Sequence, residues 1–505
     1  MHWYELTKIA LLGTENTSFP PSSLQRLEAL GVATSQEPAR LLTEAAALLA
    51  QFRKAGFFLE KFDGDLPERP KEGAENASPK TVRHLQLILA GGQLPVLPEL
   101  LHLLQRSGKK LPASELPQLM LHPDLQLLWP QIEPSLGEDG RWLLRQHPNW
   151  RSRLQDPQQF NWQTGTREQR MAMLRYWRQH SPGFALELLA STWDSENPVD
   201  KANFLPLLAT HISENDEAFL EKCLDDRRKE VRMAAPPLLA RIGASRFTKR
   251  MQERLANCLM LEGNSLKINL FDSPDLAMLR DGIQQIHPGW PGGAKAGFLG
   301  QMMSWVSPAH WETYFGRQPA EVLALFAKTD WAETLVRATV EATALHRNAV
   351  WAEELMIFWQ QHEAMALWEQ PVCNQLARLL NPATVNRLAM NFFGKTTALP
   401  AETSPVFRLL KHSEANWSHE LSLLVLSRFR QDFVRDYRQM WQLQHLKEYL
   451  QLLGLRSDPG LFEQFQTGWS HDSVQWRMWE KLVDEMLTRV LFRREMRAAI
   501  SIGNA

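Results

Sequence analysis

Cysteine is scarce in this chain of 505 residues, which contains only Cys223, Cys258 and Cys373. Three thiols are too few and too scattered for a disulfide framework or for a zinc site built from thiolates. A reducing compartment suits such a composition best. We therefore expect a cytoplasmic protein.

The chain also lacks a large net charge. It contains 56 basic and 57 acidic residues, which gives a formal net charge of -1. No overall field attracts the chain to nucleic acid or anionic lipid, so any such binding has to be local. No uncharged run approaches the roughly 20 residues that a membrane-spanning helix requires. The apolar N-terminal run contains Glu5 and Lys8 and lacks a cleavage site, which argues against a secretion signal and predicts an amphipathic helix ending at Gly13.

Signatures of β-strands are few, and no Asn-Gly turn joins two alternating runs, so a sheet has little to be built from. Apolar residues instead recur at spacings of three and four, as in Trp331, Leu335, Ala338, Ala342 and Leu345. Prolines and glycines separate the helical segments. With 44% hydrophobic residues the chain can bury a large core. The sequence predicts an all-α protein.

Residues 216–251 are the most informative stretch, because they predict two antiparallel helices joined by a tight turn of acidic and basic residues. Leu220 belongs to the apolar stripe of the first helix, and Val231 belongs to that of the second. This is the pattern of a HEAT-like repeat, and such repeats bury their apolar faces by stacking into an α-solenoid. Pro236 and Pro237 fall inside the second helix and predict a kink or a restarted helix there.

The turn of this repeat supplies the candidate binding residues, which are Asp225, Asp226, Arg227, Arg228 and Arg232. The two aspartates are placed to cap the second helix, where negative charge also suits the helix dipole. In stacked repeats an arginine of the second helix can bridge to the acidic turn next door. We expect mainly a structural ladder of ion pairs between repeats, and a site for an anion or a partner is the alternative.

Two stretches interrupt the helical pattern. Residues 61–80 are polar and rich in Pro, Gly and charge, which predicts an exposed loop. Residues 286–300 contain five glycines and two prolines, which predicts a joint. We therefore expect an N-terminal helical array over residues 1–285 and a C-terminal array over 301–505, arranged as one continuous solenoid with a joint or as two arrays.

Motifs that would carry catalysis are lacking. The segment GWPGGAK at 289–295 does not have the GxxxxGK[ST] spacing that cradles phosphates, so a flexible joint is the better interpretation. His362 lacks the second histidine of a helical zinc protease, because Ala366 stands four residues later. No GxSxG elbow occurs, and no cysteine lies in a nucleophile pattern. The sequence predicts no enzyme, no cofactor and no metal site.

Tryptophan is unusually frequent, with 19 residues against 5 tyrosines. We expect most of these rings to fill wide gaps between helices, although tryptophan also anchors interfaces. Residues 221–254 hold ten basic residues and five acidic ones, a local surplus of five. A basic stripe on helical repeats can bind nucleic acid, so a nucleic-acid-binding repeat protein, including one like a base-excising glycosylase, is the alternative function.

Several stretches along the chain resemble landmarks of an uncharacterised bacterial family, domain of unknown function 5691. These are ALLGTE (10–15), LGEDGRWLLRQHPNW (136–150), STWDSENPVDKANFLPLL (191–208), FLEKCLDDRRKEVRMAA (219–235), PAHWETYFG (308–316), DWAETLVRA (330–338) and NWSHELS (416–422). They keep their order over most of the chain. The sequence departs from the family pattern at Pro236 and Pro237, where a plain helical run is expected.

The resemblance implies partners and gives no catalytic residues. Proteins similar to this chain are often encoded beside a MoxR-type AAA+ ATPase, a von Willebrand A-domain protein and a SWIM zinc-finger protein. Together with the expected solenoid, this association predicts a non-enzymatic adaptor or scaffold that binds other proteins.

Overall fold

The chain consists of two compact units, Met1–Arg69 and Pro70–Ala505. The computed structural model describes residues 3–35, 37–55, 68, 70–71, 73–147, 150, 160–285, 290, 292–363, 365–396, 398–433, 440–472 and 476–501.

The first unit contains three helices, α1 (Trp3–Leu12), α2 (Pro21–Ala29) and α3 (Pro38–Ala55). Its small core includes Leu6, Ile9, Leu27 and Leu41. The first helix ends where the sequence predicts, because Gly13 adopts a left-handed φ of 87° and its N–H donates to the Ile9 carbonyl at 3.0 Å.

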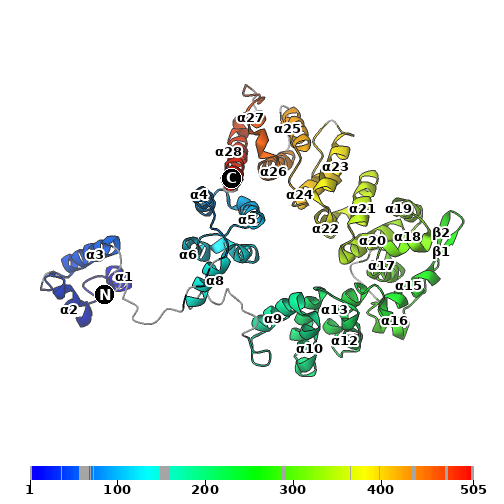
Figure 1. Cartoon of the computed structure of the whole chain (residues 1–505), viewed down its shortest axis with the longest axis horizontal. Coiled ribbons are helices and arrows are strands. Elements are labelled where there is room, and N and C mark those ends of the chain that lie inside the picture. Colours follow the sequence, from blue (N-terminus) through cyan, green and yellow to red (C-terminus); the bar gives the residue numbers. More distant parts are fainter. Residues whose placement is uncertain are drawn as a thin grey trace. The chain divides into compact units, whose positions relative to one another are not determined.

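The second unit begins with a bundle of short helices: α4 (Pro79–Leu89), α5 (Leu97–Arg106), α6 (Leu116–Leu121), α7 (Trp129–Ile132) and α8 (Gly137–Gln146). Its core also includes Met496 and Ile500 from the last helix, α28 (Trp476–Ser501). The start of this unit therefore packs against α28, and Figure 1 draws α28 beside α4 and α5.

The helices that follow the bundle are α9 (Arg167–His180), α10 (Pro182–Thr192), α11 (Pro198–Phe204), α12 (Glu217–Cys223), α13 (Lys229–Ala234), α14 (Pro236–Ala240), α15 (Arg246–Cys258), α16 (Leu276–Arg280), α17 (Gly293–Trp305), α18 (Ala309–Phe315), α19 (Pro319–Ala327), α20 (Ala332–His346), α21 (Ala349–Gln361), α22 (Cys373–Leu379), α23 (Pro382–Phe393), α24 (Pro405–His412), α25 (His419–Phe433), α26 (Met440–Arg456) and α27 (Phe462–Gln466). The predicted all-α class is confirmed.

One small hairpin departs from the helical pattern. Strands β1 (Leu259–Glu262) and β2 (Ser265–Ile268) pair in antiparallel register, with Leu259 opposite Ile268. Gly263 takes a φ of 62° in the two-residue turn, a conformation that glycine adopts without strain. The Gly263-Asn264 pair is therefore the local signal for this hairpin.

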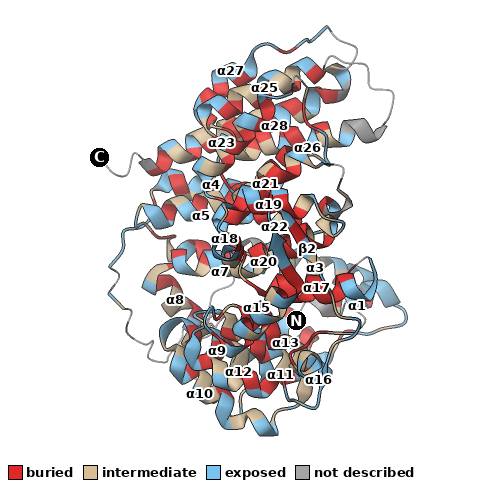
Figure 2. Ribbon diagram, turned by 90° about the vertical axis from the view of Figure 1, so that its right-hand side faces the viewer, coloured by how far each residue is buried: buried red, intermediate tan, exposed pale blue. Residues whose placement is uncertain are grey.

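From α19 to α25, alternate helices contact one another, and α20 also contacts α17, three helices earlier. Helix α20 packs against α17 and α22, and α22 packs against α24, while α21 packs against α19 and α23. Successive helices such as α19 and α20, or α20 and α21, are also in contact. Figure 2 shows buried and exposed residues side by side along these helices, as amphipathic helices require.

The predicted restart in the second helix of the repeat is confirmed. Helix α13 ends at Ala234 and α14 begins at Pro236. Proline is tolerated at a helix start, where its missing N–H has no intrahelical acceptor. The apolar side chains of both pieces, including Val231, Leu238 and Leu239, remain in the core.

The predicted joint lies partly outside the described residues, at 286–289 and 291. Within it, α17 begins at Gly293, and Trp290 is buried against Gly300, where a Cβ would come within 2.5 Å of the indole ring. The joint, and the arrays 1–285 and 301–505, stay predictions. Of the predicted loop at 61–80, residues 61–67, 69 and 72 lie outside the described residues, and α4 begins at Pro79.

Tryptophan rings fill the interior, and the largest buried side chains include Trp311, Trp351, Trp359 and Trp479. The indole N–H of Trp351 donates to Glu312 at 2.8 Å, which satisfies this buried donor. In the described part of the chain, no helix is long and apolar enough to cross a membrane.

Candidate binding site at an acidic and basic turn

The candidate residues surround the turn between α12 and α13. Asp226 shapes this turn, because its Oδ1 accepts from the backbone N–H of Arg228 at 2.9 Å. Arg228 itself precedes α13 and makes no side-chain capping bond. The aspartate therefore stabilises the turn rather than capping the helix directly.

Basic side chains from other elements hold both aspartates. Arg280 of α16 donates to the two carboxylate oxygens of Asp225 at 2.7 and 2.8 Å. These hydrogen bonds lower the pKa of Asp225 and raise the pKa of Arg280. Lys201 of α11 pairs with Asp226 at 3.3 Å.

A second group of ion pairs involves Glu221 of α12 and Asp281, which follows α16. Arg250 of α15 reaches Glu221 at 3.0 Å and Asp281 at 2.7 Å, and Arg254 reaches Asp281 at 2.7 Å. Asp281 is 1% exposed, so its charge is stabilised by these arginines rather than by water. Arg280 also contacts Glu221 at 3.2 Å. The acidic side chains at 221, 225, 226 and 281 are therefore all paired.

Similar ion pairs recur on both sides of the turn. They link residues that are 25 to 33 positions apart in the sequence, namely Arg167–Asp200, Arg170–Glu196, Lys201–Asp226, Glu217–Arg246 and Glu221–Arg250. These pairs join α9 to α11 or to the segment before it, α11 to the turn after α12, and α12 to the start and middle of α15. Ion pairs between distant segments are therefore present in this part of the chain, and a ladder between stacked repeats stays a prediction.

Among the described residues, the three predicted arginines make none of these ion pairs. Nη1 of Arg232 donates to the backbone carbonyls of Asp226 and Arg227 at 2.8 and 3.0 Å. Arg232 therefore stabilises the turn between α12 and α13. Arg227 and Arg228 are exposed, and within the described residues neither side chain forms an ion pair with an acidic group. Binding by these residues stays a prediction.

The sequence did not reveal the residues that complete the network, which are Lys201, Glu221, Arg250, Arg280 and Asp281. Their partners lie 25 to 59 positions away along the chain. Arg250 and Arg254 share one face of α15 by their spacing of four, which was the only local signal.

A hollow of about 400 Å³ opens beside the turn. It is lined by Lys229, Arg232 and Met233 from α13, by Leu279 from α16, and by residues 282–285. The backbone at Gly282 passes close to Pro236, and only glycine fits there without strain. Its φ is 90°, and a Cβ would lie 2.9 Å from Cγ of Pro236.

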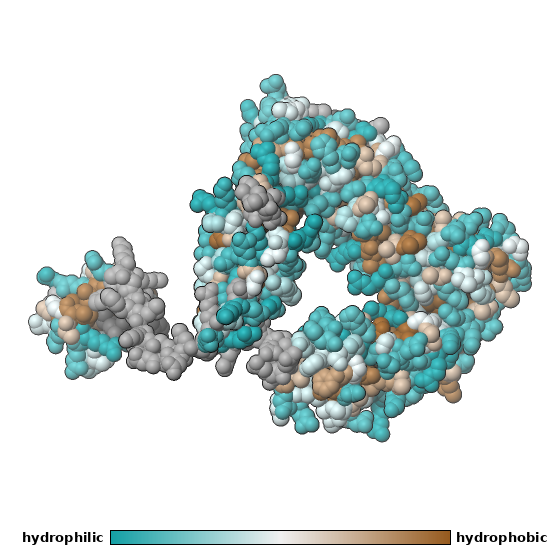
Figure 3. Space-filling view, viewed as in Figure 1, coloured by the Kyte–Doolittle hydropathy of each residue, from teal (hydrophilic) through white to brown (hydrophobic). Residues whose placement is uncertain are grey.

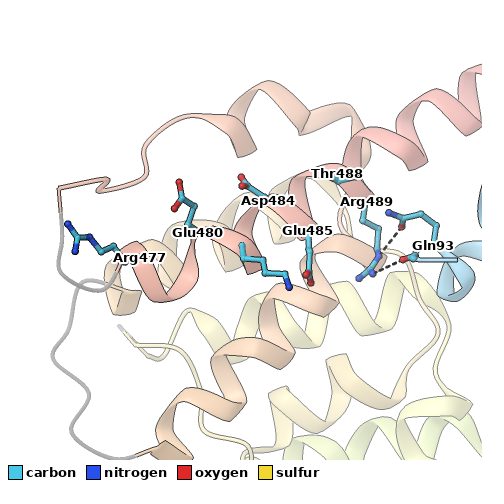
Figure 4. A pocket seen from close by; sticks show the side chains of 9 residues that line it. Gln93, Arg477, Glu480, Asp484, Glu485, Thr488 and Arg489 are labelled. Atoms are coloured by element: carbon cyan, nitrogen blue, oxygen red, sulfur yellow. Dashed lines mark hydrogen bonds between the residues drawn. The ribbon is translucent and has the colours of Figure 1, made fainter.

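A larger hollow of about 690 Å³ lies between α28 and the turn after α4. Figure 4 shows Arg477, Glu480, Asp484 and Glu485 along it, with Arg489 at the end next to Gln93. Most of its lining side chains are charged, whereas small-molecule sites are mainly apolar with a few polar groups. This hollow therefore does not resemble a site for a small apolar ligand.

A third hollow, of about 340 Å³, lies between α19 and α21, and its lining includes the apolar Leu323 and Ile357 and the polar Gln361 and His362. Burial raises the pKa of Glu354 at its edge, and the neighbouring Glu353 acts in the same direction. Among the described residues, no group of three or more His, Cys, Asp and Glu side chains could hold a metal ion.

Comparison with known proteins places the chain in a family. No curated protein matches it. A model described as a family of unknown function (DUF5691) matches residues 5–500, which is nearly the whole chain. This protein therefore belongs to the DUF5691 family.

Proposed function

We propose that the protein is a non-enzymatic adaptor or scaffold built as a HEAT-like α-solenoid. Its partners are a MoxR-type AAA+ ATPase and a von Willebrand A-domain protein, with a SWIM zinc-finger protein in the same assembly. The family resemblance supports these partners, and the proposed compartment is the cytoplasm.

The observation that carries the proposal is the alternation of helix contacts from α19 to α25. Helix α22 lies between α20 and α24, and α21 lies between α19 and α23, as the two layers of stacked helix pairs would. The ion pairs from α9 to α15 support the same arrangement, because they link segments at a regular spacing. Repeats stacked in this way offer extended surfaces to protein partners.

The alternative of nucleic-acid binding has less support. Three of the basic residues between 221 and 254, Arg246, Arg250 and Arg254, are engaged with carboxylates. Charges that are already paired release few counterions from a phosphate backbone. On the face drawn in Figure 3, hydrophilic residues predominate and hydrophobic ones form small separate patches, which suits several limited protein contacts.

Affinity capture tests the proposal. The tagged full chain is recovered from extracts of its own cells, with and without a non-hydrolysable ATP analogue, and the retained proteins are identified by mass spectrometry. We expect stoichiometric recovery of the AAA+ ATPase that depends on the nucleotide. Recovery of nucleic acid alone, lost at moderate salt, would contradict the adaptor function.

A further inference from the structure

We propose that Arg227, Arg228 and Lys229, with the hollow beside α13, bind an acidic segment of a partner protein that carries a large apolar side chain. This inference rests on the proposed function, because it assigns a contact surface and a partner chemistry to the adaptor. We call the three cations and the hollow the α13 surface.

The first argument is the positive charge of residues 227–229, which the ion-pair network around the turn does not neutralise. Asp225 and Asp226 cannot neutralise the three cations, because Arg280 and Lys201 already occupy these carboxylates. Residues 227–229 are all exposed. Glu230, also exposed, offsets one charge at most. The surface therefore keeps a local positive charge although the whole chain is nearly neutral.

The second argument is the apolar lining next to this charge. Met233, Leu279 and Ile283 line the hollow, and Lys229 and Arg232 line it too. Leu279 is 42% exposed, and Leu276, three residues earlier on the same side of α16, is 86% exposed. Exposed apolar groups bordered by charged ones are typical of protein contact sites.

The chemistry favours a peptide over nucleic acid. No aromatic side chain lines the hollow among the described residues, whereas single-stranded nucleic acid is held largely by bases stacked on aromatic rings. An acidic peptide uses both halves of the surface, since its carboxylates face the cations and its apolar side chain enters the hollow. Arginine pairs well with carboxylates because its guanidinium can bond both oxygens.

A peptide library tests this surface even while the partner is unidentified. Random dodecapeptides displayed on phage are selected on the full-length protein, and the most enriched sequence is synthesised with a fluorescent label. Binding is then measured by fluorescence anisotropy, with a single-stranded oligonucleotide as competitor. We expect enriched sequences that are acidic and contain Leu, Ile, Met or Phe.

Two variants locate the binding. The double substitution Arg228→Glu with Lys229→Glu reverses two exposed charges, and Leu279→Gln changes the hollow. We expect about tenfold weaker binding or more from the first and a several-fold loss from the second, with unchanged thermal unfolding. The matched control is Arg175→Glu with Lys447→Glu, two exposed residues on α9 and α26, which should bind as the unaltered protein does.

Several outcomes would overturn the inference. They are enriched peptides without an acidic bias, failure to enrich any peptide, equal loss in the control variant, and an oligonucleotide that binds more tightly than the peptide. If affinity capture still recovers the AAA+ ATPase with the Arg228→Glu, Lys229→Glu protein, the adaptor function stands and only the α13 surface is wrong. If the unaltered protein recovers no protein partner, the proposed function itself fails.

Discussion

The contact between the first bundle and the last helix should depend on Glu99. The carboxylate of Glu99, on α5, accepts two hydrogen bonds from α28. Nε of Arg493 donates at 2.6 Å, and Nε of Arg497 donates at 2.7 Å. The Arg493 side chain is 0% exposed and that of Glu99 is 14% exposed. Glu99→Gln removes the negative charge while it nearly preserves the shape of the side chain.

The expected loss of stability depends on the hydrogen bonds that Arg493 keeps in the Glu99→Gln protein. Its Nη1 still donates to the carbonyls of Gly454 and Ser457 at 3.1 and 2.9 Å, so the guanidinium keeps two acceptors. It loses its only buried carboxylate partner among the described residues. Removing one member of a buried ion pair costs about 3 to 5 kcal/mol, and the retained bonds place this case near the lower value, at about 3 kcal/mol.

Hydrogen exchange followed by mass spectrometry measures, segment by segment, how far the contact between the bundle and α28 is weakened. If the bundle separates from α28 more easily by about 3 kcal/mol, amides that are protected by the contact exchange about a hundredfold faster. The effect should appear in α4, α5 and the last turns of α28, where Thr81 also donates to the Ala499 carbonyl at 3.4 Å. Helices α19 to α23 should keep their protection.

A control variant replaces a different glutamate that pairs with α28. It shows whether loss of one negative charge is enough to change hydrogen exchange. Glu463→Gln removes the partner of Arg494, a pair at 2.8 Å whose side chains are 68% and 37% exposed. Exposed pairs contribute up to about 1 kcal/mol, so little should change. The reasoning is refuted if both variants accelerate exchange equally, or if Glu99→Gln leaves α4 and α28 as protected as before.

The same pair predicts a pH dependence. Burial alone would raise the pKa of Glu99, but the charges and hydrogen bonds of Arg493 and Arg497 outweigh it and hold the pKa below its ordinary value of 4.5. A lowered pKa in the folded state means that the stabilisation is fully present above pH 4.5. It is lost as the pH falls through the folded-state pKa, and Glu99→Gln should abolish that acid dependence.

Three further changes test the interior. Arg178→Met leaves the Asp216 carboxylate buried without its bidentate partner and should lower the free energy of unfolding in urea by about 3 to 5 kcal/mol; a change below about 1 kcal/mol would contradict this. Gly282→Ala places a Cβ at a φ of 90° and 2.9 Å from Pro236, and should cost about 2 kcal/mol in the same assay, whereas an unchanged midpoint would show that the turn adapts. Burial raises the pKa of Cys223 to about 12, so iodoacetamide at pH 8 should label it in urea and not in the native protein, as mass spectrometry can decide.

Local patterns in the sequence predicted local structure well. The spacing of three and four predicted the helices, and the ring constraint of Pro236 predicted the restart that separates α13 from α14. Gly13 predicted the end of α1 for a similar reason, since glycine adopts the left-handed conformation without strain. The hairpin at Leu259–Ile268 was not predicted, because its Gly-Asn turn was not recognised.

Contacts between distant segments could not be predicted in the same way. Glu99 and Arg493 are 394 residues apart, and Asp225 and Arg280 are 55 apart, so nothing in the local sequence couples them. The aspartates were identified at the turn, but their partners come from α11 and α16. Which charges are paired decides which remain available to a partner, and that distinction required the structure.

The proposed adaptor function requires physical association with the proposed AAA+ ATPase partner. Sedimentation velocity of the purified protein, mixed with the purified MoxR-type ATPase of the same genome and a non-hydrolysable ATP analogue, measures it without other cell components. The account predicts a faster-sedimenting complex that contains both proteins. Independent sedimentation of the two unaltered proteins at micromolar concentration, with and without nucleotide, would contradict it.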